Sequence, residues 1–271
     1  MKILVTGHKG YIGSRLFKDL QRLEHNVVGI DLKDGNDIFY CLPDEHFDFV
    51  FHLAAFPRVQ YSIENPSYTL RQNVLMTSVL LEWARNHGVS RVIFSSSAAA
   101  EECKSPYGLH KKMSEMECKL YSELYSLDTV SLRYYNVYSE DQQFGGAYST
   151  AISAWMEMAK KGMPMRIDGD GEQTRDFIHV EDILNANIFC MQNPHDFAGK
   201  VLNVGTGKSI SLNNIKRHLE SKGFTNWIYA PERQGDIRHS QANIMDLLRI
   251  GWEPQINLVQ GLQKCFGDLN E

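Results

Sequence analysis

Hydrophobic residues in the first half of the chain form short continuous runs, which alternate with longer stretches of helical spacing. Continuous apolar runs predict strands that are buried on both faces, here at residues 3–5, 27–30, 49–53, 91–94 and 130–133. After the first run, Ile12, Leu16, Leu20 and Leu23 recur every three or four residues, as on one face of a helix. Helices are therefore predicted between the strands, at residues 11–24, 73–86 and 107–125.

This alternation of strands and helices predicts an α/β fold. Strands separated by helices form a parallel sheet covered on both faces, and right-handed crossovers make that sheet doubly wound, as in the Rossmann fold. The pattern loosens after residue 140, with predicted helices at 149–161 and 181–192 and a strand at 200–204. We expect residues 1–140 to form the Rossmann sheet, to which some later segments return. Residues 141–271 are expected to form mainly a smaller C-terminal part that binds substrate.

Composition narrows the class of protein. Of the 271 residues, 43% are apolar and 23% are charged, as in folded globular proteins. The formal net charge of -5 argues against a nucleic-acid coat or a membrane-surface binder, since both need clustered cations. The opening apolar run is too short for a signal peptide, and no run is long enough to span a membrane. The five cysteines are scattered without a Cys-x-x-Cys pair, which predicts free thiols in the cytoplasm and no metal site.

A glycine-rich turn lies between the first predicted strand and helix. Gly7, Gly10 and Gly13 have the spacing G-x-x-G-x-x-G, which lets the backbone approach a pyrophosphate at the amino end of a helix. Asp31 ends the second predicted strand, 18 residues after Gly13, where its carboxylate can accept hydrogen bonds from an adenosine ribose. The same carboxylate repels a 2'-phosphate, so we expect NAD rather than NADP. The alternatives are a tight turn for the glycines and a helix or turn cap for Asp31.

Two further segments are candidates for contact with the cofactor. Asp37 and Ile38 can pair with the adenine amino group and pack on its ring, or they can belong to a solvated loop. Leu53, Ala54 and Ala55 follow the third predicted strand, where small residues leave room for a ligand. We interpret the preceding His52 as a packed or hydrogen-bonded histidine rather than a catalyst.

Candidate catalytic residues follow the fourth predicted strand. Tyr107 and Lys111 are four residues apart on a predicted helix, so both side chains lie on one face. We expect the ammonium, and a positively charged nicotinamide, to lower the pKa of the phenol, so that it can take a proton from a hydroxyl group. Ser95, Ser96 and Ser97 end the strand at the sheet edge where ligands of such folds bind. Three serines at this place could also only cap a turn.

Taken together, these segments resemble the extended short-chain dehydrogenase/reductase family. The resemblance is to its nucleotide-sugar epimerases and dehydratases, above all to UDP-glucose and UDP-N-acetylglucosamine 4-epimerases. It runs nearly end to end, through residues 6–13, 52–55, 73–77, 105–111, 132–138, 169–177 and 233–236.

The resemblance implies a role for individual residues. Ser97, Tyr107 and Lys111 would form the catalytic trio, with Lys111 also holding the nicotinamide ribose. The same resemblance implies NAD contacts at further positions, namely Tyr11, Ile12, Asn73 and Ser95. It implies contacts with a UDP-sugar at Asn136, Arg175, Arg233, Asp236 and Ser240. Arginine forks suit a diphosphate, although Arg175 could instead pair with Asp176 or Asp182.

The residues after Ser97 bear on the reaction. Dehydratases of the family carry an Asp-Glu pair directly after this position, and this chain has Ala98-Ala99. The resemblance therefore implies a 4-epimerase that removes a hydride and returns it to the other face of the sugar. The bridge to Tyr107 is about 15 residues shorter than in relatives, and Glu101 or Glu102 could act as a second acid or base. A 4,6-dehydratase, a 4-ketoreductase and a non-catalytic dinucleotide sensor remain alternatives.

The sugar and the oligomeric state are finer expectations from the same resemblance. Residues 145–148 and 152–155 are similar to those of enzymes that act on N-acetylated UDP-sugars. Ser240 occupies a wall position that carries a Tyr in strict UDP-glucose epimerases, so UDP-GlcNAc and UDP-GalNAc are the expected substrates. Related enzymes pair the helices corresponding to 73–86 and 107–125 in a dimer, and we expect a homodimer.

Overall fold

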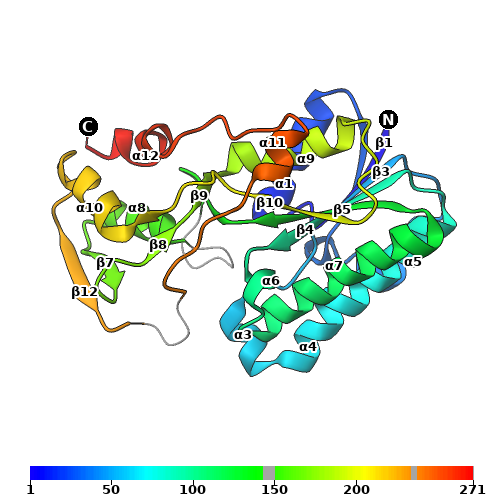
Figure 1. Cartoon of the computed structure of the whole chain (residues 1–271), viewed down its shortest axis with the longest axis horizontal. Helices are drawn as coiled ribbons and strands as arrows, with labels where there is room; N and C mark the ends of the chain where they lie inside the picture. Colours follow the sequence, from blue (N-terminus) through cyan, green and yellow to red (C-terminus); the bar gives the residue numbers. More distant parts are fainter. Residues whose placement is uncertain (143–149, 233–236, 271) are drawn as a thin grey trace. The chain divides into compact units, whose positions relative to one another are not determined.

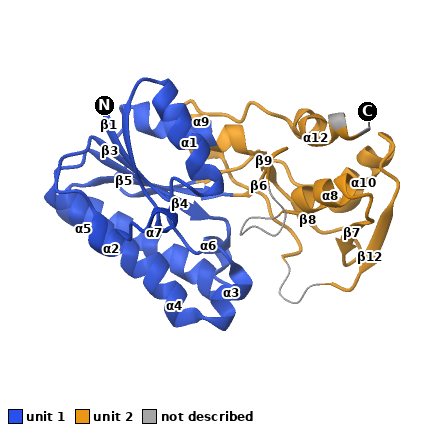
Figure 2. Cartoon of the chain, turned by 180° about the vertical axis from the view of Figure 1, so that it is seen from behind, with its two compact units in different colours: residues 1–134, 184–202 blue, residues 135–183, 203–271 orange. Residues whose placement is uncertain are grey.

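The chain divides into two compact units. The computed structural model describes residues 1–142, 150–232 and 237–270. Unit 1 comprises residues 1–134 and 184–202, and unit 2 comprises residues 135–183 and 203–271 (Figure 2). The division thus falls six residues before the expected boundary at 140, and a later segment returns to the first unit. Each unit is described below by itself.

Unit 1 is built around a six-stranded sheet with helices on both sides. The elements in chain order are β1 (Lys2–Thr6), α1 (Tyr11–Arg22), β2 (Asn26–Ile30), α2 (Ile38–Cys41), β3 (Phe49–His52), α3 (Val59–Glu64), α4 (Pro66–Leu70), α5 (Met76–Asn86), β4 (Arg91–Ser97), α6 (Ala99–Glu102), α7 (Pro106–Tyr125) and β5 (Asp128–Tyr134). Most of α9 (Val180–Gln192) and the first residues of β10 (Lys200–Val204) complete the unit. Figure 1 shows α1 and α9 on one side of the sheet and α5 and α7 on the other.

The order of the strands places a ligand site at one edge of the sheet. The order is β10-β5-β4-β3-β1-β2, and the pairs from β5 to β2 are parallel. The winding reverses at β1, because β2 pairs on one side of it and β3 on the other. In such sheets, ligands bind beyond the carboxyl ends of the strands at this reversal. The predicted doubly wound parallel sheet is confirmed.

The buried residues explain why the apolar runs form central strands. Ile3, Leu4 and Val5 are fully buried, as expected for a strand covered on both faces. On the α5 side, Leu80 packs in one cluster with Val92. Ile12, Leu16 and Leu20, which have helical spacing, are buried in α1. Leu23, the next residue at this spacing, is the C-cap of the helix and is exposed.

The helix predicted at 73–86 begins earlier and irregularly. Helix α4 runs into a π-helical turn at Arg71–Leu75, which continues into α5. The carbonyl of Asn73 accepts hydrogen bonds from the hydroxyls of Thr77 at 2.6 Å and Ser114 at 3.2 Å. Side-chain hydroxyls that bond to helix carbonyls compete with the regular ladder. The pattern of apolar residues alone does not reveal such a local distortion.

Unit 2 contains short strands and helices around a second core. Its elements are β6 (Asn136–Tyr138), α8 (Ala151–Lys160), β7 (Met165–Asp168), β8 (Thr174–Arg175), β9 (Phe177–His179), β11 (Ile210–Ser211), α10 (Leu212–Glu220), β12 (Trp227–Ala230), α11 (Met245–Arg249) and α12 (Leu258–Phe266). Strands β6 and β9 pair in parallel, as do β7 and β12, whereas β8 and β11 are antiparallel. The fully buried Trp155 anchors the core, and its indole N–H donates to the carbonyl of Arg166 at 2.7 Å.

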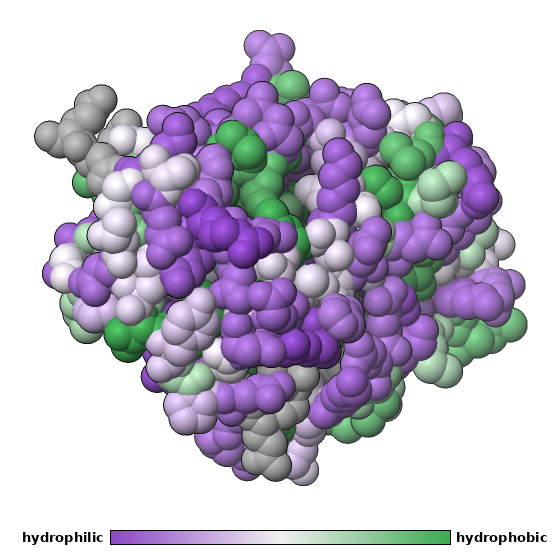
Figure 3. Space-filling model, turned by 60° about the vertical axis from the view of Figure 1, so that its left-hand side comes forward, coloured by the Kyte–Doolittle hydropathy of each residue, from purple (hydrophilic) through white to green (hydrophobic). Residues whose placement is uncertain are grey.

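The surface matches the composition. On the face drawn in Figure 3, hydrophilic side chains predominate and hydrophobic ones occur in small separate groups. Among the described residues, no helix is long and apolar enough to cross a membrane. The five cysteines, all within the described ranges, are free thiols.

Candidate active site

The turn after β1 requires glycine at two positions. Gly7 has φ of +73°, and a Cβ on it would lie 2.7 Å from the backbone nitrogen of Ala54. A Cβ on Gly13 would lie 2.1 Å from the carbonyl oxygen of Gly7. Real Cβ atoms do not approach backbone atoms so closely, so the turn packs against α1 and the end of β3 only because both residues lack side chains. The G-x-x-G-x-x-G spacing therefore reflects close packing at the reversal point of the sheet.

The amino end of α1 can receive an anion. Gly10 is its N-cap residue, and no side chain of the described residues caps this end. The first backbone N–H groups of a helix have no partner within the helix and lie at the positive end of its dipole. Tyr11 and Ile12 provide two of these groups. This arrangement fits the pyrophosphate of a dinucleotide.

Asp31 and Asp37 both cap short helical turns and remain able to accept further hydrogen bonds. The Asp31 carboxylate accepts from the backbone N–H groups of Lys9 and Lys33, each at 2.9 Å. Asp37 accepts from the N–H of Phe39 at 3.0 Å. A carboxylate has about four acceptor positions, so capping and ribose binding by Asp31 are compatible. The predicted contacts of Asp31 and Asp37 with NAD stay predictions. Ile38 lies in the hydrophobic core, and its predicted packing on the adenine ring also stays a prediction.

The segment after β3 lies against the glycine turn. The backbone N–H of Leu53 donates to the carbonyl of Thr6 at 3.2 Å, and that of Ala54 to the Thr6 hydroxyl at 3.3 Å. Ala55 follows, and the buried Asn73 amide both accepts from and donates to the backbone of Phe56, at 2.7 and 3.1 Å. Asn73 thus holds this segment in place, and its predicted contact with the cofactor stays a prediction.

His52 has a structural role, as the sequence indicates. Its Nδ1 lies 2.8 Å from the hydroxyl of Thr6 and its Nε2 3.0 Å from that of Thr77. Burial lowers the pKa of His52 to about 3, helped by the charge of Lys111. A neutral imidazole in two hydrogen bonds connects β1, β3 and α5, and it does not exchange protons near neutral pH.

The three serines at the end of β4 face different partners. The carbonyl of Ser95 accepts from the Lys111 ammonium at 2.6 Å, and the hydroxyl of Ser95 lies 2.9 Å from that of Tyr134. The Ser97 side chain is close enough to the phenol of Tyr107 to lower its pKa, against the larger effect of burial. The sheet edge and α7 therefore bring together all three residues predicted to form the catalytic trio, and Ser95 positions one of them.

The pKa of Tyr107 differs from the expectation. Burial raises it to about 12, and the hydrogen bond with Ser97 offsets only part of this. Burial also lowers the pKa of Lys111 to about 8, so its cationic form is itself disfavoured. The expected lowering of the phenol pKa is wrong for this structure, because burial is the largest cause of the shift and acts upward.

A buried ion pair beside the trio escaped the sequence interpretation. Glu115 accepts hydrogen bonds from the Ser96 hydroxyl at 2.6 Å and from two nitrogens of Arg133 at 2.7 and 2.8 Å. Glu115 lies four residues after Lys111 on α7. This spacing is a signal that could have indicated a shared helix face.

Candidate substrate residues within unit 2 gather around β8. The Asn136 amide donates to the carbonyl of Asp176 at 2.9 Å, and the backbone N–H of Ser240 donates to the carbonyl of Thr174 at 3.1 Å. Arg175 lies between these two positions in β8. Three of the predicted substrate residues are thus neighbours in space, although they are up to 104 residues apart in sequence.

The carboxylates next to Arg175 are engaged with backbone groups. Asp176 is fully buried and accepts four hydrogen bonds, from the N–H and hydroxyl of Thr206 and from the N–H groups of Gly207 and Ala242. Asp182 accepts from two backbone N–H groups, those of Gln255 and Ile256. Asp176 is therefore a structural centre of unit 2.

Some predicted positions lie outside the described residues. These are Arg233 and Asp236, together with residues 145–148. Their roles stay predictions.

The short bridge between β4 and α7 folds as a single helical turn. Glu101 accepts from Arg133 at 3.3 Å, and Glu102 forms an ion pair with Lys104. Both carboxylates thus have cationic partners within the bridge or on β5.

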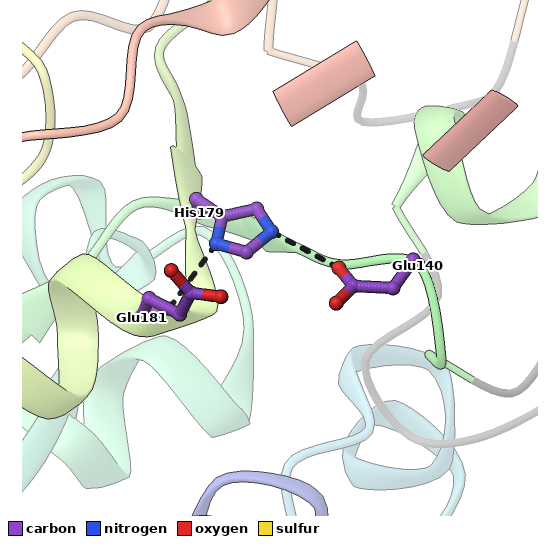
Figure 4. A group of neighbouring side chains, drawn as sticks. All are labelled: Glu140, His179 and Glu181. Carbon is purple, nitrogen blue, oxygen red and sulfur yellow. Dashed lines mark hydrogen bonds and ion pairs between the residues drawn. The ribbon is translucent and has the colours of Figure 1, made fainter. Parts of the chain in front are cut away.

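A separate cluster in unit 2 joins His179 with Glu140 and Glu181. One ligand atom from each of the three lies within 4.8 Å of the others. Figure 4 shows the imidazole between the two glutamates. Nε2 lies 3.2 Å from Glu140, and Nδ1 accepts from the backbone N–H of Glu181 at 3.4 Å. Both ring nitrogens of His179 are thus in hydrogen bonds with the neighbouring groups.

Comparison with known proteins decides the family. The family model described as "NAD dependent epimerase/dehydratase family" matches residues 3–205. The chain belongs to this family. A UDP-glucose 4-epimerase of Mycolicibacterium smegmatis is 30% identical, over 97% of each chain. The fold is similar to UDP-glucose 4-epimerase of Thermotoga maritima with UDP-glucose, at 29% identity, a TM-score of 0.87 and full coverage of both chains. It is also similar to UDP-N-acetylglucosamine 4-epimerase of Methanobrevibacter ruminantium with UDP-N-acetylmuramic acid, at 29% identity, a TM-score of 0.88 and coverage of 98% and 97%.

These similarities confirm three predictions made from the sequence: that the chain is an enzyme, that its cofactor is NAD, and that it resembles the nucleotide-sugar epimerases. The chain is an NAD-dependent enzyme of the epimerase/dehydratase family. The glycine turn and the amino end of α1 fit NAD, since the turn admits a backbone approach and the helix end favours an anion.

Proposed function

We propose that this enzyme is a 4-epimerase of UDP-sugars. The observation that carries the proposal is the buried phenol of Tyr107 near Ser97 at the carboxyl edge of the sheet, with Lys111 one helical turn away and bonded to the Ser95 carbonyl. The 4-epimerases among its relatives support the same reaction. The glycine turn, Asp31 and the segment after β3 are the proposed NAD contacts.

Each residue of the trio has a distinct task. NAD+, held by the glycine turn and Asp31, would supply the acceptor and donor of the hydride. Tyr107 takes the proton of the 4-hydroxyl, and Ser97 donates a hydrogen bond to the same substrate oxygen. Burial raises the pKa of Tyr107, so formation of the phenolate that takes this proton requires added positive charge near the ring, which an oxidised nicotinamide would supply. Lys111 is proposed to hold the nicotinamide ribose.

The surroundings of Ser97 favour epimerisation over dehydration. Removal of water needs a second acid or base near the sugar, and Ala98 and Ala99 follow Ser97 directly. The nearest carboxylates along the chain, Glu101 and Glu102, have Arg133 and Lys104 as partners.

The proposed substrates are UDP-GlcNAc and UDP-GalNAc. Asn136, Arg175 and Ser240 are proposed to bind the nucleotide sugar, together with Arg233 and Asp236. A small side chain at Ser240 leaves space for a 2-acetamido group. Ser240→Tyr should therefore reduce turnover of acetamido sugars more than turnover of plain hexoses. An unchanged ratio of the two rates would show that Ser240 does not line the sugar pocket.

The decisive experiment is incubation with a panel of UDP-sugars, with products identified by NMR. Epimerisation conserves mass, dehydration loses water, and ketoreduction consumes NADH in equal amount. Tyr107→Phe should abolish turnover and retain NAD binding, since it removes only the proton acceptor. A pure dinucleotide sensor would turn over no sugar before or after this substitution.

A homodimer is the proposed assembly. Helix α7 exposes a row of apolar residues at helical spacing, Leu109, Met116, Leu120 and Leu124, of which Met116 and Leu124 are each 62% exposed. A monomer rarely leaves such a row in water. Analytical ultracentrifugation should give about twice the mass of one chain, and Met116→Glu should weaken the dimer. The cytoplasmic location stays a prediction.

A further inference from the structure

Two adjacent residues of β4 are tied to two residues of α7. The Ser95 carbonyl accepts from Lys111 at 2.6 Å, and the Ser96 hydroxyl donates to Glu115 at 2.6 Å. Lys111 and Glu115 are four residues apart, which is about one turn of α7. The end of the strand and the helix are therefore joined by two polar contacts side by side.

Glu115, the acceptor in the second contact, also belongs to a buried ion pair with Arg133. Glu115 is 1% exposed, and Arg133 holds both of its oxygens through two nitrogens, at 2.7 and 2.8 Å. Arg133 is also the register partner of Ser96 across β4 and β5. A carboxylate at this depth is tolerated only with a close cationic partner and further hydrogen bonds. The three residues thus form one unit, referred to here as the Glu115 clamp: Ser96, Glu115 and Arg133.

The Glu115 clamp also contacts the bridge that carries the chain from Ser97 to Tyr107. Arg133 donates to Glu101 in α6 at 3.3 Å. It therefore connects the end of β4, the bridge and α7, the three segments that hold Ser97, Tyr107 and Lys111.

Glu115 acts on the charge of Lys111 as well. The groups that influence the Lys111 pKa are Cys118 and Glu115, both on α7, and they raise it against the effect of burial. Burial raises the pKa of Cys118 to about 12, and on β3 burial keeps His52 neutral. On β4, the Phe94 ring lies 4.6 Å from the ammonium. Glu115 is the carboxylate among these groups, so its negative charge favours the cationic form of Lys111.

We propose that the Glu115 clamp is a positioning device for catalysis, which orients Lys111 and Ser97 for the reaction. This inference rests on the proposed 4-epimerase function. A displacement of about 1 Å at a reacting group can cost about 100-fold in rate, so a device that holds the strand end against α7 acts on kcat rather than on substrate affinity.

The test is Glu115→Gln, with Asp128→Asn as the matched control. Asp128 forms an ion pair with the buried Arg91, and the two residues lie opposite each other across β4 and β5. Ser96 and Arg133 lie opposite each other in the same way, at the other end of these two strands. The first readout is the Lys111 pKa from 13C NMR of lysine side chains, assigned with Lys111→Met. The second is kcat and KM for the UDP-sugar, and the third is the melting temperature.

Glu115→Gln should lower the Lys111 pKa and reduce kcat by about 10- to 100-fold, with KM unchanged. Asp128→Asn should reduce only the melting temperature. The inference is overturned if Glu115→Gln changes the melting temperature but leaves the Lys111 pKa and kcat as in the control. If the unaltered chain epimerises no UDP-sugar, the proposed function fails, whereas the NMR shift still tests the effect of Glu115 on Lys111.

A milder variant covers the case in which Glu115→Gln does not fold. Ser96→Ala removes the contact with β4 and leaves the pairing of Glu115 with Arg133 intact. It should lower kcat, and Ser96→Thr, which retains the hydroxyl, should restore it. Equal kcat in Ser96→Ala and the unaltered chain would overturn the positioning role.

Discussion

Gly7→Ala is a sharp test of the cofactor turn. Gly7 has φ of +73°, and a left-handed conformation costs a residue with a side chain about 1–2 kcal/mol. The added Cβ would lie 2.7 Å from the nitrogen and 2.9 Å from the Cα of Ala54, so the turn or the end of β3 must move. Such overpacking costs about 1–3 kcal/mol. We therefore expect a loss of about 2–5 kcal/mol of stability, or a melting temperature lower by about 10 °C.

The matched control for this variant is Gly88→Ala. Gly88 has φ of +64°, and no described atom lies within 4 Å of the position of its Cβ. This control measures the backbone strain without the contact. Thermal unfolding by circular dichroism and NAD binding by calorimetry are the assays. Gly7→Ala should also weaken NAD binding by about tenfold or more, equivalent to about 1.4 kcal/mol, because the displaced backbone lies at the proposed pyrophosphate site. If Gly7→Ala melts at the same temperature as Gly88→Ala and binds NAD with unchanged affinity, the reasoning is refuted.

Three further predictions concern buried polar groups. Arg91→Met should destabilise the chain by about 3–5 kcal/mol in urea unfolding, since it removes the cation that pairs with the partly buried Asp128 and donates to three carbonyls. A loss below about 1 kcal/mol would mean that the ion pair of Arg91 with Asp128 is solvated. The pKa of His52 falls from 6.5 in the unfolded chain to about 3, so stability should decline as pH drops from about 6.5 towards 3. In urea unfolding at pH 7 and pH 4.5, His52→Gln should show a smaller decline than the unaltered chain, and equal declines would contradict the assigned burial. Asp176→Asn replaces an acceptor by a donor facing backbone N–H groups, and should lower the melting temperature by several degrees, an effect that unchanged unfolding curves would exclude.

Much of the fold of unit 1 was predictable from local patterns. The strand expected at 200–204 has the bounds Lys200–Val204, and the helix expected at 107–125 differs from α7 by one residue. Glycine spacing also indicated the turn after β1, where steric contacts leave no room for a side chain. Such signals are local, because apolar periodicity records which face of an element is buried and glycine records where the backbone is crowded.

The candidate site was only partly predictable. The placement of Tyr107 near Ser97 follows from the order of the strands and from the short bridge between β4 and α7. The direction of the Tyr107 pKa shift cannot be predicted in this way, because it depends on how deeply the phenol is buried. Similarly, the sequence does not reveal that Asn73 holds the backbone of Phe56.

By itself, then, the amino-acid sequence determined the alternation of elements, the glycine turn and the spacing of Tyr107 and Lys111 on one helix. Only the tertiary structure decided that Glu115 meets Arg133 18 residues later, which later residues return to unit 1, namely 184–202, and that burial rather than charge governs the pKa of the phenol. The physical reason is that periodicity and turn chemistry act between residues close in the chain. Desolvation and ion pairing depend instead on which distant segments pack together.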